Sequence, residues 1–173
     1  EPGFVYRAEK DGTGFVMYNV DPGLNDSSSF ALAKSKSAAA SVLTDAGVPA
    51  VEHRFLLNER SKYASGDVRL RAKSSLDAFG GRAVVKRDDG AQGDQVYLAE
   101  DAAALDAALD AIFALKLDAA LSPYMPSERE YRVVVLAGEP RLMLGKRRGR
   151  SWKHNLSGGA SAVDVAESLR PGL

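Results

Sequence analysis

Apolar residues recur at helical spacing in two stretches of the chain. They are Phe30, Leu32, Ala39, Val42 and Leu43 in the first stretch, and Leu105, Leu109, Ile112 and Phe113 in the second. Such a stripe is typical of a helix that packs one face on a core. The first stripe predicts a helix over residues 29–45, ended by Gly47 and Pro49. The second predicts a helix that Asp101 caps.

Short apolar runs bounded by turn residues predict strands. They cover residues 50–57, 83–86, 95–98, 120–125, 131–136 and 141–144. A short helix candidate that ends at Gly80 and Gly81 separates the first two runs. The runs at 83–86 and 95–98 flank a glycine-containing loop, and a turn at 137–140 joins the last two runs, so we expect two hairpins. The order of elements predicts an α+β fold in two lobes.

Residues 1–28 are rich in turn formers, such as Asp11-Gly12, around one strand candidate at residues 15–18. We interpret this region as a connecting segment or the edge of a missing N-terminal domain. The sequence begins with Glu1 rather than methionine and stops soon after an expected helix start, so we expect both ends to be cut.

Composition narrows the possible partners. The 173 residues are 45% hydrophobic and 27% charged, which suits one core or two small subdomains. The 23 basic and 23 acidic residues cancel, so no overall field favours nucleic acid or an anionic membrane. No apolar run approaches the roughly 18 residues that span a bilayer, and the N-terminus lacks a signal-peptide pattern. We therefore expect a cytoplasmic protein, and the absence of cysteine excludes thiolate chemistry.

A lysine beside a glycine-containing loop is the first candidate site. The apolar strand at 83–85 delivers Lys86, and a loop with Gly90, Gln92 and Gly93 follows. Glycine lets backbone N–H groups converge on an anion, and the lysine adds a point charge, so the arrangement suits phosphates. Neither the P-loop nor the dinucleotide loop matches, because here the lysine precedes the glycines. An ordinary hairpin loop is the alternative interpretation.

Three motifs in order connect this loop to a known superfamily. They are Lys36 eleven positions before Gly47-Val48-Pro49, the loop after Lys86, and the run from Trp152 to Gly159. With these motifs the chain resembles the ATP-grasp superfamily over roughly residues 29–165. Within it, the chain is most similar to the ribosomal-protein-glutamate ligases and related amino-acid ligases, which have a glutathione-synthetase-like ATP-binding domain.

The resemblance implies an α+β ATP-grasp fold, in which two α/β lobes with mostly antiparallel sheets enclose a nucleotide cleft. By this resemblance residues 29–119 form the first lobe with its glycine-rich flap. Residues 120–173 form the second lobe, which we expect to be truncated at its C-terminus.

The same resemblance implies a set of phosphate-binding residues. They are Lys36, Lys86, Gly90, Gln92 and Gly93. The loop would close over the β- and γ-phosphates and exclude water. The family usually has an aspartate before the helix lysine, whereas this chain has Ser35, which leaves that aspartate's supporting role open. A solvated helix lysine is the alternative interpretation of Lys36.

Nucleoside contacts are implied by the residues that follow. Tyr124 and Met125 would line the purine pocket, with a place in the core as the alternative. Glu130 would accept the ribose hydroxyls, and Glu128 is a nearby competitor for this role.

The last implied contacts lie near the C-terminus. Lys153 and Asn155 would reach the phosphates or a metal, and an edge strand with a glycine turn is the alternative. Arg147 would be the catalytic residue that binds the carboxyl or acyl-phosphate group, although a basic run of this kind is usually a solvated loop. The run lacks interleaved aromatic residues, so it does not indicate nucleic-acid binding.

The implied function is an ATP-dependent carboxylate–amine ligase that forms an amide through an acyl phosphate. ATP and Mg²⁺ would be its cofactors, with metal ligands that the sequence does not identify. Its partners would be a small-molecule carboxylate and an amine, such as an amino acid or a peptide, without nucleic acid or membrane, and a homo-oligomer stays open. The alternative is a nucleotide-binding module without ligase activity.

Overall fold

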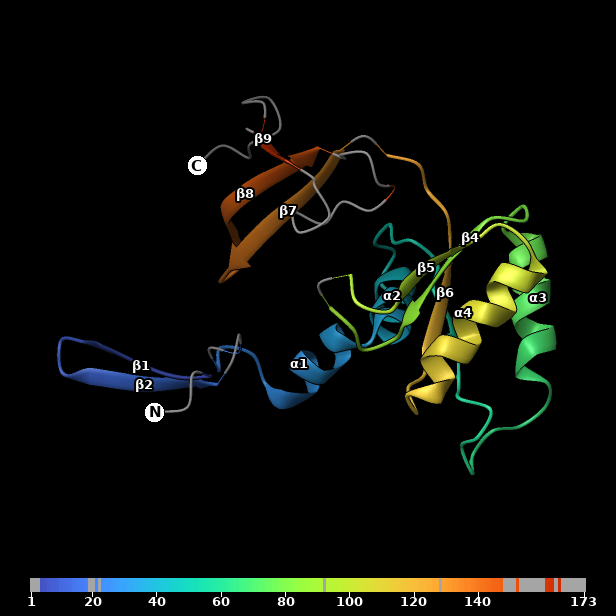
Figure 1. Cartoon of the computed structure of the whole chain (residues 1–173). Helices are drawn as coiled ribbons and strands as arrows, with labels where there is room; N and C mark the ends of the chain where they lie inside the picture. The colour runs from blue at the N-terminus through green and yellow to red at the C-terminus, as the bar shows by residue number, and fades with distance from the viewer. Residues whose placement is uncertain are drawn as a thin grey trace.

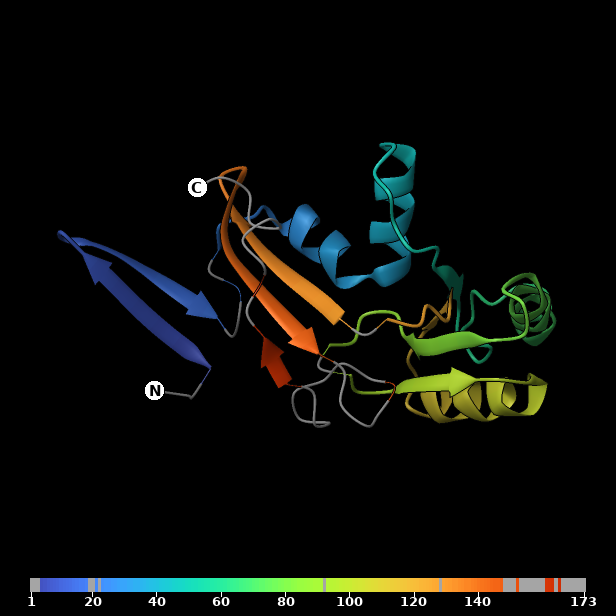
Figure 2. The ribbon, with the colours of Figure 1, turned by 90° about the horizontal axis from the view of Figure 1, so that it is seen from above.

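The structure, a computed structural model, describes residues 4–18, 21, 23–91, 93–127, 129–147, 152, 161–163 and 165. Its elements are β1 (Val5–Lys10), β2 (Thr13–Tyr18), α1 (Ser27–Lys34), α2 (Lys36–Asp45), β3 (Arg54–Leu56), α3 (Val68–Ala78), β4 (Ala83–Arg87), β5 (Val96–Ala99), α4 (Ala102–Ala114), β6 (Ala119–Pro123), β7 (Arg129–Leu136), β8 (Glu139–Arg147) and β9 (Ser161–Val163). They form a β1–β2 hairpin, a sheet of order β3-β6-β4-β5 and a sheet of order β7-β8-β9 (Figures 1 and 2). Every strand pairing among the described residues is antiparallel.

The four-stranded sheet carries the main core together with α3 and α4 (Figure 1). The core contains Leu56, Val68, Ala72, Leu76, Ala83, Val85, Ala99, Leu105, Ala108, Leu109, Ile112, Phe113, Ala119 and Leu121. Successive side chains of a strand point to opposite faces. Ala83 and Val85 therefore enter this core, whereas Val84 and Lys86 face the other side of the sheet.

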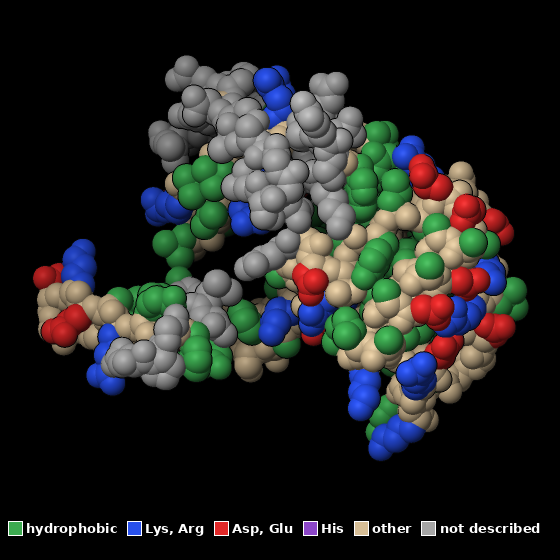
Figure 3. All heavy atoms as spheres, viewed as in Figure 1, with side chains coloured by type: hydrophobic (Ala, Val, Ile, Leu, Met, Phe, Trp, Pro, Cys, Tyr) green, Lys and Arg blue, Asp and Glu red, His purple; other side chains and the backbone are tan. Residues whose placement is uncertain are grey.

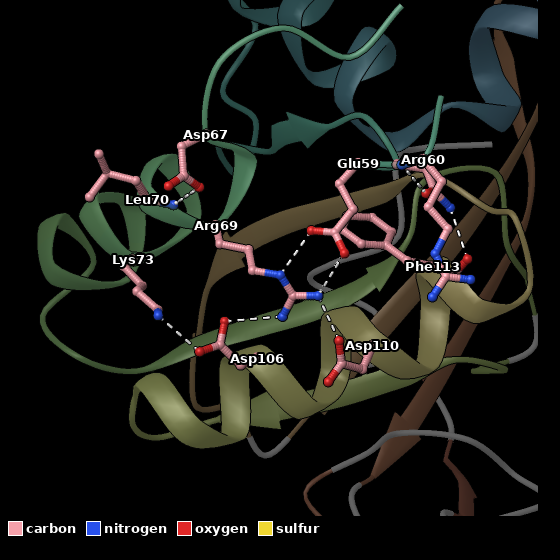
Figure 4. A network of polar contacts seen from close by, with 10 residues as sticks. Glu59, Arg60, Asp67, Arg69, Leu70, Lys73, Asp106, Asp110 and Phe113 are labelled. Carbon is pink, nitrogen blue, oxygen red and sulfur yellow. Dashed lines mark hydrogen bonds and ion pairs between the residues drawn. The ribbon is translucent and has the colours of Figure 1, made fainter. Parts of the chain in front are cut away.

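Arg69 of α3 joins the two helices outside this core (Figure 4). Its guanidinium lies 2.9 Å from Glu59 and 2.6 Å from Asp110. It also lies 3.4 Å from Asp106, whose carboxylate accepts a bond from Lys73 at 2.9 Å. The hydrogen bonds that Arg69 donates to Glu59 and Asp110 raise the pKa of Arg69. Solvent-exposed ion pairs contribute about 0–1 kcal/mol each, so this network orients the helices more than it stabilises the fold.

The first predicted helix is wrong in one respect, because two helices replace it. Ser35 separates α1 from α2 with extended backbone angles, φ −84° and ψ 117°. Its hydroxyl accepts a hydrogen bond from the backbone N–H of Ala38 at 3.1 Å, so Ser35 begins a new helix as its N-cap. Gly47, at φ 71°, follows the end of α2 as expected.

The N-terminal region contains a strand that the sequence pattern missed. β1 pairs with β2 across the turn Asp11-Gly12, whose φ values of 53° and 74° are those of a tight two-residue hairpin turn. Figure 1 shows this hairpin projecting from one end of the molecule, joined to it through α1. The strand predicted over residues 50–57 is shorter in the structure, where it is only β3.

The predicted hairpin after residue 130 is confirmed. β7 and β8 turn at Ala137 and Gly138, with φ values of 53° and 81°. The expected lobe boundary at residue 119 falls at the start of β6, which pairs with β3 and β4 in the four-stranded sheet. A division of the chain into lobes at this point stays a proposal.

Candidate functional site

A cleft of about 440 Å³ lies between the four-stranded sheet and the start of β7. It is lined by Val51, His53, Val84, Lys86, Gly93, Val96, Ser122, Pro123, Tyr124, Met125, Ser127, Arg129, Glu130 and Trp152. Many of these side chains are apolar or aromatic, and the charged ones are Lys86 of β4 and Arg129 and Glu130 of β7. A concave, mostly apolar cleft with a few placed polar groups is typical of a small-molecule site.

Lys86 is the cation on the sheet side of the cleft. The register of β4 places it opposite Val96 on β5 and Ala120 on β6. Its ammonium makes no ion pair or hydrogen bond with any residue in the described part of the chain. Burial, and to a lesser degree the positive charge of Lys36, lowers the pKa of Lys86 to about 8. A partly buried charge without a partner is costly, so an anion in the cleft would stabilise it.

Tyr124 and Trp152 provide an aromatic wall. Their ring centroids lie 6.2 Å apart at an interplanar angle of 73°. The guanidinium of Arg82 lies 4.3 Å from the Tyr124 ring centroid, and the Arg82 carbonyl accepts the Tyr124 N–H at 3.2 Å. Met125 is 62% exposed and is therefore not a core residue. These contacts fix the Tyr124 ring beside an open apolar surface that suits a flat ligand.

Glu130, the second residue of β7, lines the cleft. Its Oε1 accepts a hydrogen bond from the Lys146 ammonium at 2.7 Å. The two residues are direct cross-strand partners, so the register of β7 and β8 places them on the same face. Sequence analysis did not single out Lys146. Strict alternation from the turn at 137–138 would place Gly145 opposite Glu130, but the register shifts between Val134 and Val135, and this irregularity brings Lys146 to that position.

His53 is a second group that sequence analysis left out of the site. Its Nδ1 lies 2.8 Å from the Val51 carbonyl, and its ring lines the cleft. Burial lowers the pKa of His53, and Lys86 lowers it further. The imidazole is therefore neutral near pH 7.

The chain matches known proteins by its fold and not by its sequence. No protein-family model and no curated protein match the sequence. Solved structures do match the fold. D-alanine–D-alanine ligase from Bacillus anthracis in complex with ATP superposes with a TM-score of 0.58, at 16% identity over 78% of this chain. The D-cycloserine synthetase DcsG gives 0.60, at 17% identity over 80% of this chain.

A third match is D-alanyl-alanine synthetase A from Vibrio cholerae O1 biovar eltor, with a TM-score of 0.59 and 13% identity over 79% of this chain. These proteins are ATP-grasp enzymes. This chain has the ATP-grasp fold. It spans only 40%, 48% and 42% of the three matched chains, respectively. At identities this low, the structural superposition establishes the fold alone and not the substrates or the activity.

Within the ATP-grasp fold, the predicted site residues fall into two groups. Lys86, Gly93, Tyr124, Met125 and Glu130 share the cleft. Another set, Lys36, Gly90 and Arg147, is described but does not line it. Gln92, Lys153, Asn155 and the competitor Glu128 lie outside the described residues.

Lys36 has a different environment from Lys86. Its ammonium donates to the carbonyls of Arg87 at 3.1 Å, Asp88 at 3.0 Å and Gly90 at 2.5 Å. The three acceptors lie at the end of β4 and at the start of the loop between β4 and β5. A direct contact of Lys36 with phosphate stays a prediction, and in the structure its ammonium binds the loop.

Arg147 ends β8 directly opposite Arg129 of β7. Its place beside a substrate carboxyl group also stays a prediction. Among the described residues, no group of three or more His, Cys, Asp or Glu side chains could hold a metal ion. The part of the chain that the structure describes has no helix long and apolar enough to cross a membrane.

Proposed function

We propose that this chain is the nucleotide-binding part of an ATP-dependent carboxylate–amine ligase, which forms an amide through an acyl phosphate. The observation that carries the proposal is the Lys86 ammonium, which lines a mostly apolar cleft and has no partner among the described residues. ATP offers such a site both phosphates for the cation and a flat purine for the apolar walls. A neighbour of the same fold whose structure holds ATP supports this choice.

The proposed reaction has two steps. A carboxylate oxygen of the first substrate attacks the γ-phosphorus of ATP, the bond from that phosphorus to the β,γ-bridging oxygen breaks, and ADP leaves. The amine of the second substrate then attacks the carbonyl carbon of the acyl phosphate, loses a proton and displaces inorganic phosphate. The first step needs little proton transfer, so positioning and charge neutralisation would carry the catalysis.

Different walls of the cleft would hold different parts of ATP. Lys86 would contact the phosphates and neutralise part of their charge. Tyr124 and Met125 would line the purine, and the backbone carbonyls of the segment after β6 would accept from its amino group. Glu130 would accept the ribose hydroxyls, with its carboxylate held in place by Lys146 at 2.7 Å.

The loop between β4 and β5 would cover the phosphates. Gly93 belongs to the cleft lining and has a φ of 77°, a conformation that favours glycine. Together with Gly90 and Gln92 it would bring backbone N–H groups to the β- and γ-phosphates. A closed loop would also exclude water, which matters because an acyl phosphate hydrolyses readily.

The remaining roles belong to the proposal as well. Lys36, Lys153 and Asn155 would approach the phosphates, and Arg147 would bind the carboxyl or acyl-phosphate group. Magnesium would arrive on the phosphates of ATP. Because the described residues offer no cluster for a cation, we assign no step to it. The proposed setting is the cytoplasm, with a homo-oligomer left open.

The substrates would be small molecules such as amino acids, since the neighbours of this fold are named as a D-alanine–D-alanine ligase and a D-cycloserine synthetase. The test is ADP release with a panel of amino acids, offered singly and in pairs. We expect ADP only when both a carboxylate and an amine donor are present, together with an amide product identified by mass spectrometry. Lys86→Met should abolish the signal, whereas Lys34→Met, on the exposed face of α1, should keep it.

Two results would contradict the ligase. ADP formed without either substrate would indicate an ATPase or a kinase. Binding of MgATP without ADP release for any pair would favour the alternative, a nucleotide-binding module that makes no bond. The observation that favours this alternative is that the described residues contain no cluster of metal ligands.

A further inference from the structure

Asp88 is a buried carboxylate that the proposed chemistry does not use. It follows β4 and stands two positions after Lys86, and it is only 6% exposed. Its Oδ1 accepts a hydrogen bond from the backbone N–H of Ser37 at 2.9 Å, and its Oδ2 accepts one from the Ser35 hydroxyl at 2.5 Å. Both partners belong to the N-terminus of α2, more than 50 residues earlier in the chain.

The backbone of Asp88 is held at the same place. Its N–H donates to the Asp118 carbonyl at 3.0 Å, and its carbonyl accepts the Lys36 N–H at 3.1 Å. The Lys36 ammonium adds bonds to the carbonyls of Arg87, Asp88 and Gly90. The first residues of the loop are therefore fixed to α2 through one side-chain carboxylate, one ammonium and one backbone hydrogen bond.

The hydrogen bonds of Asp88 are additional to the local N-cap of α2. Three other helices are capped locally, with Asp26, Asp67 and Asp101 at the position just before α1, α3 and α4. α2 has a local cap as well, because Ser35 accepts from the Ala38 N–H at 3.1 Å. Asp88 adds a second, long-range bond to a helix that already has its N-cap. A buried carboxylate at a helix N-terminus is also favoured by the helix dipole, which strengthens the attachment of the loop.

Among the described residues, the second half of the loop is attached to β4 rather than to α2. The Gln95 carbonyl accepts the Arg87 N–H at 3.2 Å, and the Asp94 carboxylate lies 3.6 Å from the Arg87 guanidinium. Gly93 and Gln95 there have positive φ values of 77° and 49°, and Gly93 reaches the cleft. The part of the loop that is bound to α2 therefore ends at Gly90. Lys86 belongs to β4, two residues before Asp88, so the attachment of Asp88 to α2 also fixes the end of the strand that carries Lys86.

We propose that Asp88 is a positioning residue that clamps the base of the loop to α2, so that Lys86 points into the cleft. The inference rests on the proposed function, because it assigns the clamp a role in nucleotide binding. It assigns the Lys36 ammonium a role in ordering the loop base.

The test compares Asp88→Ala with Asp67→Ala, which removes a cap carboxylate from α3 away from the cleft. MgATP affinity is measured by calorimetry and stability by urea denaturation. Hydrogen exchange of the free proteins follows the amides of residues 36, 37 and 88. We expect Asp88→Ala to weaken MgATP binding at least fivefold, and Asp67→Ala to leave it within twofold of wild type at comparable loss of stability. Asp88→Asn keeps the acceptor for Ser37 and should recover most of the affinity.

Hydrogen exchange separates this inference from the proposed function. If wild-type protein binds no MgATP, the proposed function fails, and the clamp is then judged by whether Asp88→Ala deprotects the amides at 36, 37 and 88 ahead of the rest of α2. Unchanged MgATP affinity in a folded Asp88→Ala protein would overturn the positioning role, and so would unchanged exchange at those amides. If Asp88→Ala does not fold, Ser35→Ala removes the hydroxyl donor to Asp88 and is judged by the same two outcomes, with a smaller expected loss of about twofold.

Discussion

The two larger sheets of the molecule have opposite relations to solvent. In the four-stranded sheet, Val85 and Leu121 are completely buried, and α3 and α4 supply the core that covers them. In the three-stranded sheet every residue of β7 is exposed, including Val135 at 58%. Figure 3 shows hydrophobic side chains at the surface of the β7–β8 ribbon and the β1–β2 hairpin, in contrast to the mixed charges over α3 and α4.

The cleft therefore takes its two sides from sheets that differ in how they are stabilised. Its cation, Lys86, stands on a strand whose opposite face belongs to a packed core. Its carboxylate, Glu130, stands on a ribbon that is held mainly by backbone pairing and by the Lys146 bond. Substitutions in the first sheet should therefore change the stability of the whole domain, and substitutions in the second should change the cleft more than the stability.

The largest expected difference between the sheets is in folding stability. Phe113→Ala removes the largest fully buried side chain and should lower the free energy of unfolding by about 3–5 kcal/mol. Val135→Ala, in the exposed ribbon, should cost about 1 kcal/mol or less. Urea denaturation of both variants measures the contrast. Equal losses would show that the ribbon has a core of its own and would remove the distinction.

The next effect concerns Lys86 and pH. Its pKa in the free protein is about 8, below the ordinary value of 10.5, and a bound anion should raise it. Binding therefore takes up a proton between about pH 8 and the higher pKa of the complex, and MgATP affinity should fall roughly tenfold as pH rises through this window. Calorimetry in buffers of different ionisation enthalpy measures the uptake. The Lys86→Met protein should show no uptake in this window, and uptake that persists in this variant would contradict the assignment.

Glu130 should have a smaller effect that depends on the sugar. Glu130→Gln removes the charged acceptor and should weaken MgATP binding about three- to tenfold, in line with about 1 kcal/mol for a hydrogen bond. The loss should shrink with 2′-deoxy-ATP, which lacks one of the proposed donors, and the four affinities form a cycle that isolates the contact. Lys146→Met should produce a similar but weaker change. A Glu130→Gln loss that is the same for both nucleotides would place the carboxylate elsewhere.

The smallest effect on stability is expected for the ion pairs on the outer surface of α3 and α4. Arg69→Met removes the bonds to Glu59, Asp106 and Asp110 that Figure 4 shows. Because these groups are partly solvated, the loss should be about 1 kcal/mol or less and should decrease at high salt. Denaturation at two ionic strengths measures it. A loss of several kcal/mol, or one independent of salt, would assign the network a larger part in the fold.

Local patterns predicted much of this fold. The Asp101-capped helix and both predicted hairpins follow from periodicity and turn residues that act within a few positions. The break at Ser35 could not be predicted this way, because the carboxylate that holds it comes from Asp88, far along the chain. β1 was predictable in retrospect from the Asp11-Gly12 turn, whereas the short β3 depends on its pairing with β6.

The residues of the candidate site also fall into those that local motifs predicted and those that only the folded chain brings together. Lys86, Tyr124 and Glu130 were predicted from motifs, and all three line the cleft. Lys146 and His53 belong to no motif. Lys146 contacts Glu130 through strand register, and His53 lines the cleft because of the path of the chain before β3. No pattern in the sequence indicates that the Lys36 ammonium donates to three carbonyls at the end of β4 and the start of the loop.

The central claim is that the Lys86 ammonium faces the phosphates of a nucleotide bound in the cleft. Calorimetric titration with MgATP of wild type, Lys86→Met and the surface control Lys34→Met tests it directly. The account predicts at least a tenfold loss of affinity for Lys86→Met, about 1.4 kcal/mol or more, and wild-type affinity for Lys34→Met. Equal affinity of wild type and Lys86→Met would contradict the claim.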